Sequence, residues 1–189
     1  MKNNIILIGY MGCGKSTVGK KIAELLNMPF LDTDQWIEEK EEMPVSEIFA
    51  LKTEAYFRDL ETNCLKVLLQ EEKEQKAEEC INNQGLEACN RKVISVGGGL
   101  PVREENRKLL KQLGQVIYLK ANPETIYERL KGDSTRPLLQ TENPLQKIKE
   151  MIADREEKYQ AAAERVIYVD GKSVTEIIEE IIGKQGTQS

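Results

Sequence analysis

The chain has 189 residues and a net charge of −5, which fits a single domain over residues 1–189 with a core of its own. Its acidic residues are spread along the sequence and no basic stripe stands out, which argues against a nucleic-acid partner. The four cysteines lack C-x-x-C spacing, so a structural zinc site is not expected. There is no histidine, which excludes Ser–His and Cys–His nucleophilic catalysis.

The first predicted element is a buried strand over Asn4–Ile8. The residues before it are too few for a signal sequence, and no other stretch approaches the length of a membrane span. We therefore expect a cytoplasmic protein without a membrane partner. A monomer is expected as well, since no interface stripe is evident.

The octapeptide GYMGCGKS at 9–16 follows this strand and precedes a helical pattern, which is the setting of a complete P-loop. Its glycines allow backbone N–H groups to turn toward nucleotide phosphates, Lys15 can reach the terminal phosphate, and the Ser16 hydroxyl can hold Mg²⁺. Cys13 is interpreted as a small filler whose pKa the neighbouring amides and Lys15 could lower. The helix that follows adds its positive N-terminal end. Its predicted apolar face consists of Val18, Ile22, Leu25 and Leu26.

A second strand is predicted over Pro29–Leu31, followed by Asp32-Thr33-Asp34. If the chain stays extended, both aspartates point to the same side. We assign Asp32 to the magnesium shell, directly or through water, because no aspartate ends the third strand. Asp34 would then orient or deprotonate an acceptor hydroxyl. The alternative is that the two aspartates only cap the helix that begins before Trp36.

A helix is predicted around Arg58, within the pentapeptide FRDLE. The simplest interpretation of Arg58 is a surface residue paired with Glu54 or Glu61. The charged segment 71–92 is poor in large apolar residues and is expected to extend this helix and then turn.

The third predicted strand, Val93–Val96, leads into Gly97, Gly98 and Gly99. Three glycines can form a tight turn, but they also let backbone amides approach a ligand without an intervening side chain, and we favour ligand approach. The helix after them has an apolar face that consists of Leu109, Leu110 and Leu113.

The fourth predicted strand, Val116–Leu119, is followed by a helix with Asn122 as its N-cap and Pro123 at its first position. The glycine-containing segment 131–143 is expected to be a lid over the site. Arg136 precedes a proline in this segment and is suited to contact a transferring phosphate through planar, bidentate bonds.

The last predicted elements are a helix that carries Arg155, a strand over Val166–Val169 and a helix that begins with the capping box of Ser173 and Glu176. For Arg155 a solvated helix face is an equal alternative to a binding role. Five apolar, β-branched runs alternating with helices predict an α/β fold with buried parallel strands. The P-loop, the aspartate pair and the triple glycine all follow strands, so we expect them to meet in one crevice.

Taken together, six motifs resemble the shikimate kinase family: G-x-x-G-x-G-K-S-T, D-T-D, F-R-x-x-E, G-G-G, R-P-L-L and R-x-x-x-Y. Their order and spacing cover nearly the whole chain. The resemblance implies the P-loop kinase fold, a five-stranded parallel sheet flanked by helices with a lid over the active site. It also implies that ATP, with Mg²⁺, phosphorylates the 3-hydroxyl of shikimate. The segment 71–92 departs from the family, which usually has a shorter connection there.

The resemblance also implies roles for individual residues. Those expected to bind ATP are Gly12, Cys13, Gly14, Lys15, Ser16 and Thr17, together with Arg129 and Lys172 near the adenine and Arg136 in the lid. Those expected to bind shikimate are Asp34, Arg58, Gly97, Gly98, Gly99 and Arg155. Ser16 and Asp32 would hold the metal, and Lys15, Asp34 and Arg136 would be catalytic. Arg58 and Arg155 thereby change from surface residues to a pair that binds the acceptor carboxylate.

Other functions remain open at the level of sequence. A gluconate kinase would share the P-loop and the sheet, and an arginine pair suits both acids, although F-R-x-x-E with the triple glycine favours shikimate. A nucleotide-driven switch is disfavoured because neither N-K-x-D nor D-x-x-G is present. A catalytically idle binding protein is disfavoured because Lys15, Ser16, Asp34 and Arg136 are all retained.

Overall fold

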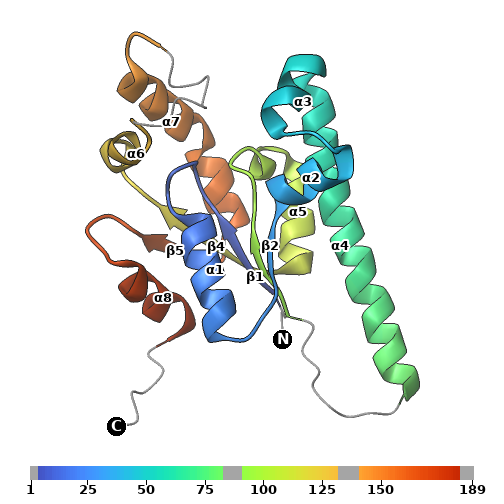
Figure 1. The fold of residues 1–189 in the computed structure, drawn as a ribbon. Coiled ribbons are helices and arrows are strands. Elements are labelled where there is room, and N and C mark those ends of the chain that lie inside the picture. Colours follow the sequence, from blue (N-terminus) through green and yellow to red (C-terminus); the bar gives the residue numbers. More distant parts are fainter. Residues whose placement is uncertain (1–3, 83–90, 132–140, 184–189) are drawn as a thin grey trace.

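A computed structural model describes residues 4–82, 91–131 and 141–183, with side chains described outside 75–82. Its centre is a five-stranded parallel sheet with the strand order β2-β3-β1-β4-β5 (Figure 1). The strands are β1 (Asn4–Ile8), β2 (Phe30–Asp32), β3 (Val93–Ser95), β4 (Gly114–Lys120) and β5 (Arg165–Tyr168). The predicted parallel α/β sheet flanked by helices is therefore confirmed.

Helices cover both faces of the sheet. They are α1 (Lys15–Leu25), α2 (Thr33–Glu41), α3 (Val45–Leu51), α4 (Glu54–Asn82), α5 (Glu104–Leu113), α6 (Pro123–Leu130), α7 (Pro144–Ala162) and α8 (Val174–Ile182), with a 3-10 turn η1 (Leu100–Val102). On one face α1 packs against α8, and on the other α5 packs against both α4 and α7 (Figure 1). Because all strands run in parallel, the loops that follow them gather at one edge of the sheet.

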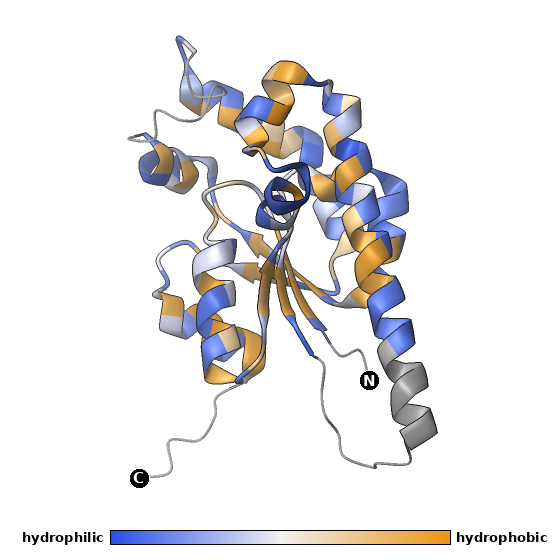
Figure 2. Ribbon diagram, turned by 45° about the vertical axis from the view of Figure 1, so that its right-hand side comes forward, coloured by the Kyte–Doolittle hydropathy of each residue, from blue (hydrophilic) through white to orange (hydrophobic). Residues whose placement is uncertain are grey.

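The core is the sheet and the apolar stripes of the helices that cover it (Figure 2). The central strand β1 is buried along its whole length, as its unbroken apolar sequence predicts for a strand covered on both faces. The prediction that all five strands are buried is wrong for the two edge strands, β2 and β5. β2 is only half-buried, and in β5 the side chain of Tyr168 is 57% exposed, because an edge strand has a neighbour on one side only.

Two expected helix details also differ. The sequence pattern predicts Leu25 on the apolar face of α1, yet the side chain is 53% exposed, whereas Val18 and Ile22 are buried as predicted. Asn122 does occupy the N-cap of α6, but its side chain makes no capping bond; its backbone N–H instead donates to the Asp170 carboxylate, at 3.0 and 3.1 Å. The capping box of Ser173 and Glu176 at the start of α8 is present.

The helix α4 extends to Asn82, so the first part of segment 71–92 continues the helix as predicted. Lys92 pairs with Glu71 at 3.0 Å and thereby ties the start of β3 to the extended helix. The expected turn at 83–90 lies outside the described residues. The side chains of Cys80 and Cys89 are likewise not described. Among the described helices, none is both long enough and apolar enough to cross a membrane.

Candidate active site

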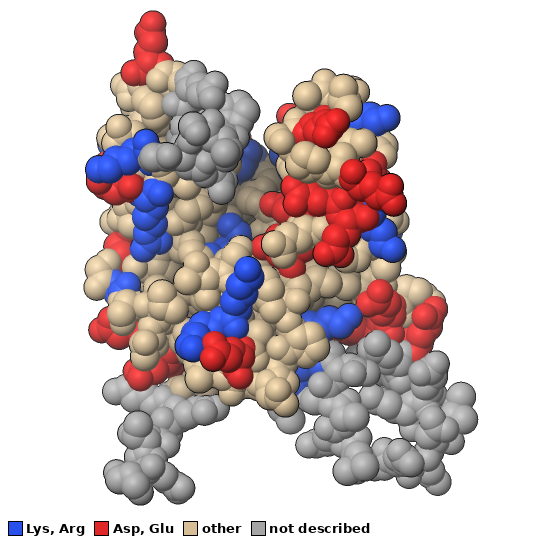
Figure 3. Space-filling view, in the orientation of Figure 1, with Lys and Arg blue, Asp and Glu red and all other residues tan. Residues whose placement is uncertain are grey.

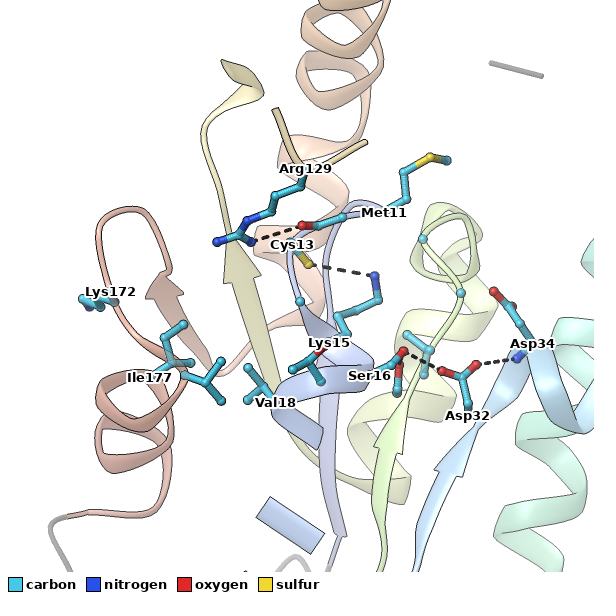
Figure 4. Close-up of a pocket in the computed structure, with 18 residues that line it drawn as sticks. Met11, Cys13, Lys15, Ser16, Val18, Asp32, Asp34, Arg129, Lys172 and Ile177 are labelled. Atoms are coloured by element: carbon cyan, nitrogen blue, oxygen red, sulfur yellow. Dashed lines mark hydrogen bonds between the residues drawn. The ribbon is translucent and has the colours of Figure 1, made fainter. Parts of the chain in front are cut away.

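The P-loop connects β1 to α1 and forms the floor of a pocket of about 510 Å³ (Figure 4). Gly9 and Gly14 have φ values of 143° and 99°, a region that residues with a side chain rarely adopt. A Cβ on Gly9 would also lie 2.5 Å from the carbonyl oxygen of Leu119. Gly14 is the N-cap of α1 and has no side chain to cap the first amides, which leaves them available to an anion.

Lys15 folds back over its own loop. Its Nζ donates hydrogen bonds to the carbonyl oxygens of Gly9, at 2.9 Å, and Tyr10, at 3.1 Å, and lies 3.9 Å from the sulfur of Cys13. The ammonium group is therefore already held at the pocket floor, where phosphate oxygens can replace the carbonyls. Cys13 is buried, in agreement with its interpretation as a small filler.

Ser16 and Asp32 meet at the carboxyl ends of β1 and β2. The Ser16 hydroxyl donates to Asp32 Oδ2 at 2.9 Å, and its oxygen lies 3.4 Å from the hydroxyl of Ser95. In the described part of the chain no group of three or more potential His, Cys, Asp or Glu ligands surrounds this point. One hydroxyl beside one carboxylate fits Mg²⁺, which keeps several waters and takes further oxygens from phosphates.

Asp32 and Asp34 do not face the same side, as an extended chain would require. The strand ends at Asp32 and α2 begins at Thr33, so the two side chains diverge (Figure 4). Asp32 caps α2, because its Oδ1 accepts from the N–H of Asp34 at 3.1 Å. Asp32 therefore caps the helix, as the alternative expects, but it does not only cap, because its other oxygen accepts a hydrogen bond from Ser16. The helical turn directs Asp34 toward Gly97 instead.

Asp34 and Glu61 bring two carboxylates to Gly97. Asp34 Oδ1 and Glu61 Oε1 lie 2.5 and 3.0 Å from the position that a Cβ on Gly97 would take. Both oxygens are buried, and neither has a hydrogen-bond partner among the described residues. Any side chain at Gly97 would therefore displace them. Asp34 also lines the pocket, so it is the one of the two that is placed to accept a hydrogen bond from a ligand hydroxyl.

Burial is the main cause of unusual pKa values at this carboxylate pair. It raises the pKa of Asp34 to about 6, helped by the charge of Asp32 and opposed by Lys15 and Arg58. It also raises the pKa of Glu61 to about 7, against the opposing charge of Arg58. Perturbed carboxylates in a pocket indicate a functional site.

Arg58 reaches the same turn from α4. Its Nη1 donates to Glu61 at 2.8 Å and its Nη2 to Glu54 at 2.9 Å, so it makes both of the ion pairs that the surface interpretation offered. That interpretation is nevertheless wrong about exposure, since only 16% of the Arg58 side chain is exposed. Its Nη1 lies 2.1 Å from where a Cβ on Gly99 would be, so Gly99 makes room for the guanidinium.

Arg155 approaches from the opposite side, on α7. It is half-buried, its Nη1 lies 3.4 Å from the Gly98 carbonyl oxygen, and its guanidinium lies over the ring of Tyr10 at 5.9 Å. A fully solvated helix face is therefore not its environment. The glycine turn thus brings together two arginines that are far apart in the sequence.

The other end of the pocket is formed by α6, the loop after β5 and α8. Arg129 donates to the carbonyl oxygen of Gly12 at 3.1 Å, and Lys172 pairs with Glu180. Both lie at the end away from Asp34, where Ile177 supplies apolar wall (Figure 4), and Val174 of the same helix also lines the pocket. The lid residue Arg136 lies outside the described residues, so its contribution stays a prediction.

Sequence reasoning missed several residues at the site. Glu61 and Tyr159 are the last residues of the motifs F-R-x-x-E and R-x-x-x-Y, and their presence there is the sequence signal for them, although the motifs do not say what their side chains contact. Val174 and Ile177 of α8 were also not predicted to line the pocket. The capping box predicts where α8 begins, but it does not indicate which part of the molecule the helix packs against.

Comparisons with known proteins agree with this geometry. The family model described as shikimate kinase matches residues 11–77 and 72–185. A shikimate kinase of Sulfurihydrogenibium sp. (strain YO3AOP1) is 42% identical over 181 residues, 96% of each chain, and one of Alkaliphilus oremlandii is 40% identical over 184 residues, 96% of this chain and 98% of that one. A solved shikimate kinase from Acinetobacter baumannii, in complex with shikimate, aligns with a TM-score of 0.80 at 35% identity, covering 96% of this chain and 91% of that chain. The chain belongs to the shikimate kinase family.

Proposed function

We propose that this protein is a shikimate kinase, which transfers the γ-phosphoryl group of ATP to the 3-hydroxyl of shikimate and releases ADP. The observation that carries the proposal is that one pocket contains both the P-loop and Asp34 with its glycine turn. Family membership supports it, as do the names of the relatives. A nucleotide alone would not need a second set of buried acceptors and arginines.

At the nucleotide end, Gly12–Thr17 bind the phosphates through backbone amides and the Lys15 ammonium. Arg129 and Lys172 flank the adenine side, and Arg136 closes with the lid. Ser16 and Asp32 would hold Mg²⁺, which when bound neutralises negative charge on the phosphates. The hydrogen bond between Ser16 and Asp32 supports this assignment, because it shows that the two oxygens lie close enough to bind the same metal ion.

At the acceptor end, Arg58 and Arg155 bind the shikimate carboxylate while the Gly97–Gly99 turn admits the ring. Asp34 holds the 3-hydroxyl in line with the γ-phosphorus. The hydroxyl oxygen forms the new P–O bond, the bond from the γ-phosphorus to the bridging oxygen of ADP breaks, and the hydroxyl proton passes to Asp34. The pKa of about 6 for Asp34 supports this role, because the group is ionised near neutral pH yet basic enough to take a proton.

The test is coupled ADP release from the purified protein with MgATP and shikimate, gluconate or no acceptor. We expect ADP release with shikimate as acceptor, and none above background with gluconate or without an acceptor. Turnover with gluconate would favour the other kinase, ADP release without an acceptor would favour the nucleotide switch, and ATP binding without turnover would favour the idle binding protein. The monomeric state and cytoplasmic location remain predictions, which size-exclusion chromatography and cell fractionation can check.

A further inference from the structure

Tyr159 is a buried tyrosine near the end of α7 whose only polar atom points at the glycine turn. Its side chain is fully buried, and its hydroxyl donates a hydrogen bond of 2.6 Å to the carbonyl oxygen of Gly98. A phenylalanine would fill the same space, so packing alone does not account for the hydroxyl. A buried tyrosine hydroxyl needs a partner, and here that partner is backbone of the acceptor end of the pocket.

Other bonds hold the two ends of the turn: the N–H of Gly97 donates to Thr33 at 3.0 Å, and the carbonyls of Gly97 and Gly99 accept from the N–H groups of Leu100 and Val102 at 3.1 and 3.0 Å. The carbonyl in the middle, that of Gly98, accepts its short bond from Tyr159 and a longer one from Arg155. Three consecutive glycines have no side chains to pack and more conformational freedom than any other residues. Because the peptide bond is planar, fixing the Gly98 carbonyl also fixes the N–H of Gly99 on its far side. The hydroxyl therefore determines the orientation of the peptide in the middle of the turn.

The same bond affects Arg155. Tyr159 lies four residues after Arg155, on the same face of α7, and both side chains reach the Gly98 carbonyl. The tyrosine makes the short contact, and the arginine a longer one of 3.4 Å. The carbonyl thus stays bonded when Arg155 turns toward a carboxylate, so the arginine can bind a ligand without leaving a buried acceptor unsatisfied.

The position of α7 itself does not depend on this bond. Tyr118 on β4 donates to Glu156 at 2.8 Å, and Lys120 on β4 pairs with Glu156 at 2.6 Å. The rings of Tyr118 and Tyr159 also pack together, with centroids 5.1 Å apart. Loss of the Tyr159 hydroxyl should therefore leave the helix in place and release only the turn.

We propose that Tyr159 is a positioning residue for the acceptor: its hydroxyl holds the Gly98 carbonyl so that the glycine turn and Arg155 are arranged to bind shikimate. This inference rests on the proposed function for the identity of the ligand. The hold on the turn, in contrast, is a property of the free protein and can be measured without any ligand.

The experiment compares Tyr159→Phe with Tyr118→Phe, which removes a hydroxyl from the same aromatic pair but leaves the bond to Gly98 intact. For Tyr159→Phe we expect the KM for shikimate to rise about 5- to 10-fold, the value of one hydrogen bond, with the KM for ATP within about 2-fold of wild type. Each variant loses one buried hydrogen bond, so both should lower the melting temperature by a similar amount. Tyr118→Phe should leave the KM for shikimate unchanged, because Lys120 still pairs with Glu156 and keeps α7 in place. An unchanged KM in Tyr159→Phe, or an equal rise in both variants, would overturn the proposal.

Amide hydrogen exchange in the free protein, measured for the segment 93–103, is the second readout. We expect faster exchange there in Tyr159→Phe than in wild type or Tyr118→Phe, because the turn opens more often. Equal exchange in all three would refute the hold on the turn. If wild type shows no turnover with shikimate, the proposed function fails, while this measurement still decides whether Tyr159 holds the turn.

Discussion

Asp34 and Glu61 illustrate how burial changes the chemistry of single residues. Each carboxylate has an oxygen that is buried without a partner, and both oxygens converge on a glycine that leaves them space. Unsatisfied buried acceptors are costly, and of these two only Asp34 lines the pocket, where a ligand can supply the missing donor. A hydroxylated acceptor such as shikimate can supply such donors.

Replacing Asp34 with asparagine tests its role in proton transfer. Asparagine keeps the size and one carbonyl oxygen but cannot take the hydroxyl proton. We expect kcat to fall about 10²- to 10⁴-fold, with the KM for ATP changed less than about 3-fold, because the P-loop is untouched. Initial rates at varied ATP and shikimate give both values. A variant with wild-type kcat would remove Asp34 from the mechanism.

Replacing Arg58 with alanine removes one of the two arginines at the acceptor end. Charge-assisted hydrogen bonds contribute about 1.5–3 kcal/mol, so the KM for shikimate should rise about 10- to 100-fold while the KM for ATP stays close to wild type. Arg58→Lys is the matched control, because it keeps the positive charge but lacks the planar guanidinium. Its KM for shikimate should lie between those of wild type and Arg58→Ala. Equal KM values in all three proteins would contradict the assignment.

The environment of Glu61 predicts how its removal changes stability with pH. Its pKa is raised from 4.5 to about 7, so the folded protein binds the proton more tightly than the unfolded chain does. The protonated Glu61 therefore contributes to the stability of the folded protein. This contribution is fully present below pH 4.5 and is lost as the pH rises through 7. Glutamine is neutral at every pH. The melting temperature of Glu61→Gln relative to wild type should therefore rise by about 5–10 °C between pH 5 and pH 8.

Thermal unfolding of both proteins across that pH range checks this expectation. The groups that face Glu61 act in opposite directions, because Asp34 raises its pKa and Arg58 and Arg103 lower it. A difference in melting temperature that falls with increasing pH would mean that the ion pair with Arg58 outweighs the effect of burial.

At the scale of elements, the glycine turn is the point where α4 and α7 act on the same ligand site. Arg58 reaches Gly99 from α4, and Arg155 and Tyr159 reach Gly98 from α7. A buried network also fastens α4 to α5 and the turn after the glycines: Thr62 donates to Asn106 at 2.8 Å, and Asn106 donates to the carbonyl of Leu100 at 3.0 Å. This network fixes α4 and α5 relative to the turn that carries the glycines.

Gly98→Ala distinguishes a tight turn from a surface that a ligand approaches. Gly98 does not have a positive φ, and a Cβ there would meet nothing closer than 3.5 Å in the free protein. We therefore expect a melting temperature within about 2 °C of wild type, as for a substitution without strain. If shikimate packs on the turn, the added methyl should raise its KM at least about 10-fold. Unchanged kinetics would favour the simple tight turn.

At the scale of the molecule, the active site is a hollow between the helices α6 and α7 on one side and α2 and α3 on the other (Figure 3). Acidic side chains gather over the α2–α3 side, and the net charge of the chain is −5. Long-range attraction therefore does not favour anionic ligands. Their binding must depend on local groups: the P-loop amides and Lys15 in the pocket, and the two arginines beside the glycine turn.

Nucleotide binding should stabilise the whole chain. A ligand that binds only the folded state at 100 times its Kd contributes about 2.7 kcal/mol, which for a chain of this size raises the melting temperature by about 5–10 °C. We expect this shift with MgATP and a smaller one when EDTA removes the metal, because Ser16 and Asp32 then lose their ligand. A thermal shift assay measures both. Equal shifts with and without the metal would argue against the magnesium site.

Sequence by itself determined the features that reside in contiguous residues. The P-loop, the capping box of α8 and the buried strand β1 each depend on neighbouring residues, so their patterns predicted the local structure and, through the parallel strands, the place of the site. The alternation of strands and helices predicted the fold for the same reason. Six motifs in order identified the family, which a single motif could not.

Tertiary structure decided what depends on packing between distant elements. The divergence of Asp32 and Asp34 follows from the start of α2 at Thr33, and the convergence of Asp34 with Glu61 on Gly97 follows from how α4 packs beside the sheet. The bond from Tyr159 to Gly98 joins residues 61 positions apart. Sequence patterns report which face of an element is apolar, but only the packed chain sets which polar groups meet, because those distances depend on every layer between them.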